Sequence, residues 1–140
     1  TACAWQQAGY SPLQVACNRK EIKSHGDSGQ FMGLAPQGQT VILDDVITAG
    51  TAIHHAHQLI TAAGATLKSI FTVFDRQERY SSDIKQSTRA HLQHTLNCPV
   101  ISLLTLDDLI EYTQTHSHLK RYTPALEAHR IQWGSPSSQT

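Results

Sequence analysis

An apolar run, two carboxylates and a small hydroxyl-rich turn follow one another in the segment Val41-Ile-Leu-Asp44-Asp45-Val46-Ile47-Thr48-Ala49-Gly50-Thr51. A continuous apolar run is typical of a strand buried on both faces, so we predict a parallel strand over Thr40–Leu43. Ligands of open α/β sheets bind beyond the carboxyl ends of the strands, where Asp44 and Asp45 are expected. The segment therefore predicts a ligand site at the edge of a parallel sheet.

The turn that follows predicts what this ligand carries. Thr48–Thr51 is expected to open a helix, whose free N–H groups and positive dipole end attract phosphate. Gly50 lets the backbone approach a ligand closely, and the threonine hydroxyls add donors. The alternative is an ordinary strand–helix connection in which an Asp or Thr only caps the helix. We favour the ligand site, because two adjacent carboxylates repel each other unless a partner uses them.

The segment resembles the phosphoribosyl pyrophosphate (PRPP) motif of type I phosphoribosyltransferases. Two further segments narrow this resemblance. Asn18-Arg19-Lys20-Glu21-Ile22-Lys23-Ser24-His25-Gly26 is similar to the mobile catalytic loop of bacterial orotate phosphoribosyltransferases, and Asp75-Arg76-Gln77-Glu78 is similar to the turn that contacts orotate in that family. The resemblance runs from about Thr1 to Gly134. The sequence contains no counterpart of the family's N-terminal part, which carries the pyrophosphate loop. We therefore expect a fragment or a truncated sequence.

The resemblance implies a reaction in which ribose 5-phosphate passes from PRPP to N1 of orotate, giving orotidine 5′-monophosphate and pyrophosphate in pyrimidine biosynthesis. The catalytic residues it implies are Lys23, His25, Asp44 and Asp45. The loop residues Arg19, Lys20, Lys23 and His25 would bind the pyrophosphate in the neighbouring subunit of a homodimer. In isolation, the same cluster also fits a solvated basic loop.

The remaining implied contacts lie at the sheet edge. Asp44 and Asp45 would hold the ribose hydroxyls, and the PRPP-binding set is completed by Val46, Ile47, Thr48, Ala49, Gly50 and Thr51. Orotate would be bound by Thr48 and Arg76, whose planar fork suits a carboxylate. A structural ion pair of Arg76 with Asp75 or Glu78 is the alternative. The expected cofactor is Mg²⁺, bound mainly through PRPP and water, with no protein side chain assigned to it.

Length and composition fit one domain, and the scattered cysteines fit the reducing cytoplasm. The 140 residues suffice for one core, and we expect a domain over 1–134, a mobile loop over 19–38 within it and a disordered tail over 135–140. With 11 basic and 11 acidic side chains, the net charge is zero, which argues against nucleic acid or a membrane as partners. Three scattered cysteines, expected to be buried thiols, support neither a disulfide framework nor a zinc site.

Strands and helices are expected to alternate, which predicts an α/β fold with a mostly parallel sheet flanked by helices, like the type I phosphoribosyltransferase core. The predicted helices cover 1–8, 51–63, 83–96, 106–112 and 124–133. The predicted strands cover 13–17, 40–43, 66–74 and 99–104. A Thr105-Leu-Asp-Asp108 capping box is expected to start the fourth helix.

Three other functions stay open at this point. A purine or uracil phosphoribosyltransferase would share the PRPP motif, but not the basic loop or the Asp75–Glu78 turn. A PRPP-sensing regulator would be expected to lose the loop cations or to gain a basic face. An inactive fragment is the third. The nine histidines are expected on polar surfaces rather than in a metal site.

Overall fold

The computed structural model describes residues 2–18 and 31–135. Its helices and strands follow the chain in the order α1 (Ala2–Gln7), β1 (Ala16–Asn18), β2 (Phe31–Gly33), β3 (Gln39–Ile47), α2 (Thr51–Ala62), β4 (Thr66–Asp75), α3 (Thr88–Leu96), β5 (Val100–Thr105), α4 (Leu106–Thr115), a 3₁₀ turn (Lys120–Tyr122) and α5 (Thr123–Trp133).

Three parallel strands form the central sheet, in the order β3-β4-β5. In its register, Ile70 of β4 lies between Ile42 of β3 and Val100 of β5. A separate antiparallel pair joins β1 to β2, with Cys17 opposite Met32. The predicted α/β class with a mostly parallel sheet is confirmed.

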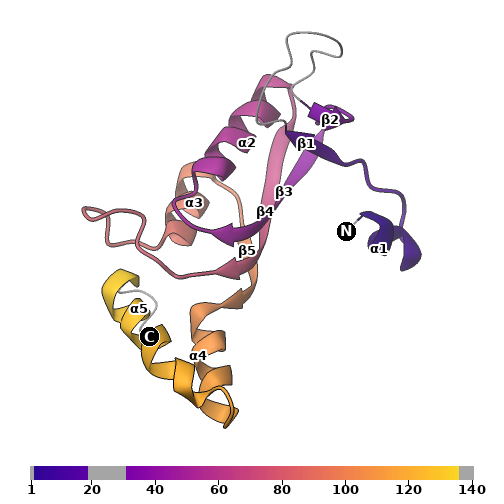
Figure 1. The fold of residues 1–140 in the computed structure, drawn as a ribbon. Helices are drawn as coiled ribbons and strands as arrows, with labels where there is room; N and C mark the ends of the chain where they lie inside the picture. The colour runs from indigo at the N-terminus through magenta and orange to yellow at the C-terminus, as the bar shows by residue number, and fades with distance from the viewer. Residues whose placement is uncertain (1, 19–30, 136–140) are drawn as a thin grey trace.

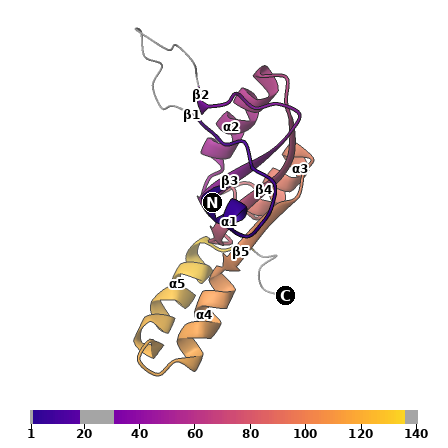
Figure 2. The same cartoon turned by 90° about the vertical axis from the view of Figure 1, so that its right-hand side faces the viewer.

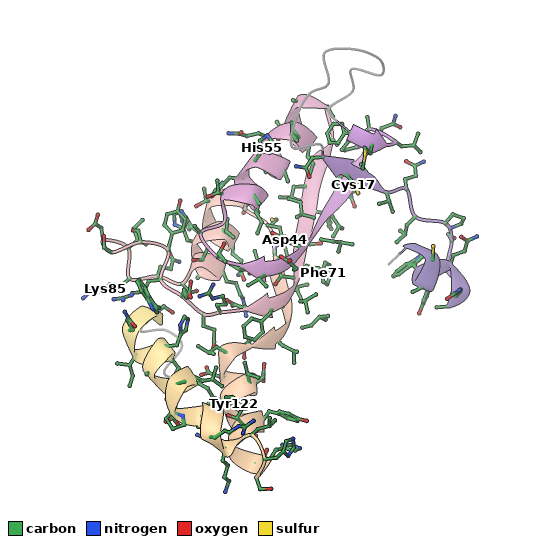
Figure 3. All side chains as sticks on the ribbon, in the orientation of Figure 1. Cys17, Asp44, His55, Phe71, Lys85 and Tyr122 are labelled. Atoms are coloured by element: carbon green, nitrogen blue, oxygen red, sulfur yellow. The ribbon has the colours of Figure 1, made fainter. Side chains whose placement is uncertain are left out.

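Helices α2 and α3 cover only one face of this sheet (Figure 1). We call it the covered face; its strands contribute Ile42, Ile70, Thr72 and Val100, all at most 8% exposed. The alternate residues form the open face, which consists of Val41, Leu43, Phe71, Val73, Ile101 and Leu103, each at least 36% exposed. Phe71 points away from the two helices (Figure 3), and α1 lies on this side of the sheet, apart from it (Figures 1 and 2).

The two C-terminal helices form a hairpin below the carboxyl ends of the strands (Figure 1). The predicted capping box at the start of α4 is confirmed. Thr105 Oγ1 accepts a hydrogen bond from Asp108 N at 3.2 Å, and the Asp108 carboxylate accepts one from Thr105 N at 2.7 Å. This reciprocal pairing satisfies backbone groups that a helix start leaves unpaired.

Several predicted boundaries were wrong. Strand β3 does not stop at Leu43 but continues through both carboxylates to Ile47. The strand predicted over 13–17 covers Ala16–Asn18 instead, and a short strand, Phe31–Gly33, lies within the range expected as a loop. Helix α3 starts at Thr88 rather than at residue 83, because Ser87 caps it by accepting a hydrogen bond from Ala90 N.

Two smaller expectations also need correction. Cys3 and Cys17 are exposed, and only Cys98 is buried. Ser135, expected in the disordered tail, is fully buried, and its N–H donates to Gln77 O at 3.1 Å. The rest of that tail and the basic loop over 19–30 lie outside the described residues. Within the described residues, no helix has the length and apolar character needed to span a membrane.

Candidate functional site

A cleft of about 400 Å³ opens at the carboxyl end of β3. It is lined by Asp44, Asp45, Val46, Thr48, Gly50, Ala52, Ile53 and Arg76. Asp44 is half-buried and Asp45 is exposed, so neither carboxylate is enclosed in apolar packing. The predicted acidic pair therefore lies in a cavity at the sheet edge, together with the turn that starts α2.

Each carboxylate of the pair is oriented by the next peptide group. Asp45 N donates to Asp44 Oδ1 at 3.0 Å, and Val46 N donates to Asp45 Oδ1 at 2.7 Å. Because these bonds use one oxygen of each side chain, the second oxygen can accept from a ligand hydroxyl or contact a cation. The arrangement suits the binding of a polyol such as a ribose.

Gly50 shapes the turn between β3 and α2. Its φ of 74° lies in the left-handed region, and an added Cβ would stand 3.1 Å from Leu92 Cδ2 of α3. The residue is the N-cap of α2 but offers no capping side chain. No side chain at this position therefore caps the first N–H groups of α2. Uncapped N–H groups at the start of a helix can donate hydrogen bonds to an anion.

Arg76 brings the positive charge to the cleft. It follows β4 directly, and its guanidinium Nη2 lies 2.6 Å from Glu78 Oε1. The structural ion pair considered from the sequence thus exists, with Glu78 rather than Asp75 as the partner. It does not remove Arg76 from the cleft, which this residue lines while its side chain remains 38% exposed.

Asp75, the last residue of β4, is 3% exposed. Burial raises the pKa of its carboxyl, while the hydrogen bond from Gln77 N at 2.8 Å and the charge of Arg89 act in the opposite direction. Gln77 itself has a φ of 54°, unusual for a residue with a side chain. Asp75 thus fixes a tight turn that directs Arg76 to the cleft.

The other predicted site residues separate into four groups. Thr51 is the first residue of α2 and is not among the residues that line the cleft. Ile47 has its side chain in the core, at 2% exposure. Ala49 lines a second cavity of about 390 Å³, together with Thr48, the segment from Glu78 to Ser82 and Trp133. The loop residues Arg19, Lys20, Lys23 and His25 lie outside the described residues. Sequence reasoning missed Ala52 and Ile53 as cleft residues, although their place in the first turn of α2 could have indicated them.

The histidines do not assemble into a metal centre in the described part of the chain. There, no group of three or more His, Cys, Asp or Glu side chains could hold an ion. His91 instead stacks on Tyr80, His116 stacks on Tyr112, and His129 contacts Glu78.

Comparisons with known proteins agree with this geometry. No family model matches the chain. The orotate phosphoribosyltransferase of Shigella sonnei is 41% identical over 134 residues, and that of Actinobacillus succinogenes is 41% identical over 120 residues. These matches cover 96% and 86% of this chain, but only 62% and 55% of the relatives.

A solved structure has the same fold. The crystal structure of orotate phosphoribosyltransferase from Francisella tularensis aligns with 96% of this chain and 62% of its own, at a TM-score of 0.72 and 21% identity. The strand order, the acidic pair at the edge of the sheet and the identities to the curated relatives are mutually consistent. The chain is similar to orotate phosphoribosyltransferases over nearly its whole length and spans about three fifths of the length of the curated relatives it matches, 62% in the first case.

Proposed function

We propose that the complete protein is an orotate phosphoribosyltransferase, which transfers ribose 5-phosphate from PRPP to N1 of orotate in the synthesis of UMP. In this reaction the bond between C1 of the ribose and the pyrophosphate oxygen breaks, and its electron pair leaves with pyrophosphate. The orotate nitrogen N1 forms the new bond to C1 and loses its N–H proton, which passes to pyrophosphate or to water. The proposal rests above all on one observation: the acidic pair, the uncapped start of α2 and Arg76 line a single cleft.

The acidic pair has the chemistry to hold the sugar. Asp44 and Asp45 each accept one backbone hydrogen bond, which fixes their orientation before any ligand arrives. Their other oxygens would accept from the 2′- and 3′-hydroxyls of the ribose. As C1 becomes positively charged in the transition state, two nearby carboxylates would stabilise it, since pre-oriented charges need no reorganisation.

The turn and Arg76 would bind the two anionic ends of the substrates. The 5′-phosphate would lie against the N–H groups of Thr48–Thr51, where the helix start favours negative charge. Arg76 would pair with the orotate carboxylate, with Thr48 as a second orotate contact. The pyrophosphate would be met by the loop cations, of which Lys23 and His25 are the proposed catalytic pair.

Mg²⁺ is the proposed cofactor, and the residues present fit it in a limited way. Carboxylate oxygens are ligands that Mg²⁺ accepts, but the described cleft offers only two such side chains. We therefore expect the ion to be held mainly by PRPP oxygens and water, where it would neutralise charge on the leaving group. Asp44 and Asp45 would orient the ribose hydroxyls beside it.

A spectrophotometric assay of orotate loss tests the proposal. The complete protein, given PRPP and Mg²⁺, should consume orotate, whereas uracil, hypoxanthine and adenine should not replace it. Consumption of a purine or of uracil instead would favour the alternative enzymes. PRPP binding without turnover of any base would favour the regulator.

Two variants divide the roles within the same assay. Lys23→Ala should lower kcat far more than it raises the KM for PRPP, because a contact to the leaving group acts in the transition state. Arg76→Ala should raise the KM for orotate selectively. Equal losses for both substrates would instead indicate a folding defect. We also propose a cytoplasmic location and a homodimer with shared active sites. Mixing two differently inactivated variants tests the shared sites, because mixed dimers should regain activity.

A further inference from the structure

Glu78 connects the proposed orotate contact to the C-terminal helix. Its Oε1 lies 2.6 Å from Arg76 Nη2 and 2.9 Å from His129 Nε2, which comes from α5. The side chains of Arg76, Glu78 and His129 are 38%, 19% and 31% exposed, with the shared carboxylate the most protected. One oxygen thus accepts from two donors that are far apart in sequence.

The backbone around Glu78 is held on both sides. Glu78 forms an isolated bridge with Gly134, and its carbonyl accepts from Thr88 N at 2.9 Å. The next residue, Arg79, donates its N–H to Trp133 O at 2.9 Å. Because the main chain is fixed in this way, the direction of the Glu78 carboxylate depends on its side-chain partners.

A second link keeps α5 against the turn independently of Glu78. Asp107 of α4 accepts from Arg130 Nη1 at 2.6 Å and from Gln77 Nε2 at 2.9 Å. Asp107 N also donates to Gln77 Oε1 at 3.0 Å. Loss of the His129–Glu78 contact would therefore leave α5 attached, so its effect can be separated from the undocking of the helix.

We propose that Glu78, itself held by His129, is a positioning residue that orients the Arg76 guanidinium toward the cleft. This inference rests on the proposed function, in which Arg76 binds the orotate carboxylate. The ion pair engages Nη2, while the other N–H groups of the fork remain available to a planar anion. A guanidinium held in advance loses less rotamer freedom when the ligand binds.

Glu78→Gln in the complete protein is the decisive variant. The change keeps the size of the side chain but removes the charge that attracts Arg76. We expect the KM for orotate to rise roughly tenfold, with the KM for PRPP and the midpoint of urea unfolding nearly unchanged. Glu127→Gln is the matched control: Glu127 accepts from Gln114 Nε2 at 3.1 Å within the same helical hairpin, away from the cleft.

Equal effects of Glu78→Gln and Glu127→Gln on orotate would overturn the inference, and so would a rise in the KM for PRPP as large as that for orotate. His129→Ala removes the donor that holds Glu78 Oε1 and should raise the KM for orotate, whereas His129→Gln keeps an N–H donor and should restore part of the loss. A KM for orotate that is unchanged in His129→Ala would contradict the role of His129.

Failure of this inference can be told apart from failure of the proposed function. If Arg76→Ala weakens orotate binding but Glu78→Gln does not, only the positioning role is wrong. If orotate is no substrate at all, the NMR resonance of Arg76 Nε–Hε still decides the matter. It should shift in Glu78→Gln and stay in place in Glu127→Gln, and an unmoved resonance in both variants would refute the contact in solution.

Discussion

The two faces of the central sheet are built from similar side chains but have opposite surroundings. On the covered face, Ile70 is fully buried beneath the helices. On the open face, Phe71 follows Ile70 in β4 and is 36% exposed, and Ile101 follows Val100 in β5 and is 43% exposed. The strands are therefore apolar on both sides, as parallel strands are expected to be, while α2 and α3 enclose one side only.

This difference shows which half of the molecule supports the cleft. Gly50, in the turn before α2, lies against Leu92 of α3, and Ile53 of the cleft belongs to the core of the covered face. The open face offers the cleft no comparable support from its large apolar residues. Perturbing the covered face should therefore alter both stability and the site, and perturbing the open face should alter neither very much.

The largest effect is expected from Ile70→Ala at the centre of the covered face. Removing three buried carbons leaves a cavity between β3, β5 and the helices, and we expect a loss of about 2–5 kcal/mol in the free energy of unfolding. Urea unfolding followed by circular dichroism measures this. A loss below about 1 kcal/mol would mean that the covered face is not the main core.

A smaller loss is expected from Gly50→Ala, where the covered face meets the cleft. Alanine would have to adopt the left-handed backbone of Gly50, and its Cβ would press on Leu92. We therefore expect a loss of about 1–3 kcal/mol in the free energy of unfolding. PRPP binding should weaken in the same variant, because the N–H groups of the turn would move. Gly64→Ala provides the control, since Gly64 has a similar φ of 75° but nothing within 4 Å of an added Cβ. Normal PRPP binding by Gly50→Ala would mean that the turn at Gly50 does not contact PRPP.

Thr105→Ala tests a region that belongs to neither face. Loss of the helix cap should cost about 1 kcal/mol of stability. The hydrogen bonds from Thr105 lower the pKa of Asp108 from its ordinary value of 3.8. The stability they contribute is therefore complete above that value and is lost as the pH falls through the lower folded-state pKa. Urea unfolding at several acidic pH values should show this dependence in wild type and a weaker one in Thr105→Ala.

The smallest effect is expected from Ile101→Ala on the open face, which is the matched counterpart of Ile70→Ala. The side chain already contacts solvent, so we expect a change of about 0.5 kcal/mol or less in this chain. The same urea experiment measures it. A cost equal to that of Ile70→Ala would erase the contrast between the faces and would mean that the open face is buried in the molecule under study.

The sequence was most informative where local order carries the chemistry. Asp44 and Asp45, the turn at Gly50 and the capping box at Thr105 are each defined within a few residues, so their pattern sufficed. Prediction of the strand end failed because a buried strand was expected to stop at its first charge. Strand β3 can carry Asp44 and Asp45 because both side chains reach the cleft rather than the core.

The contacts between the Asp75–Glu78 turn and the C-terminal helices could not be predicted in the same way. His129 meets Glu78 across 51 positions, and Arg130 meets Asp107 across 23. Neither pair leaves a periodic or spaced signal, because each depends on how the α4–α5 hairpin docks. The start of α3 was missed for a related reason: Ser87 competes for the cap with several polar residues before it, and the antiparallel bridge between Arg79 and Ser87 selects it.

Asp107 has a consequence for work at the end of the chain. Its carboxylate and its N–H both bind the Gln77 side chain, which attaches the turn to α4. The same carboxylate also accepts from Arg130 of α5. Shortened or tagged versions that disturb the last helix should therefore lose affinity for the acceptor base while the sheet remains folded. No residue of α5 lines the cleft at Asp44, so this loss of affinity would come from a change in the turn that α5 supports.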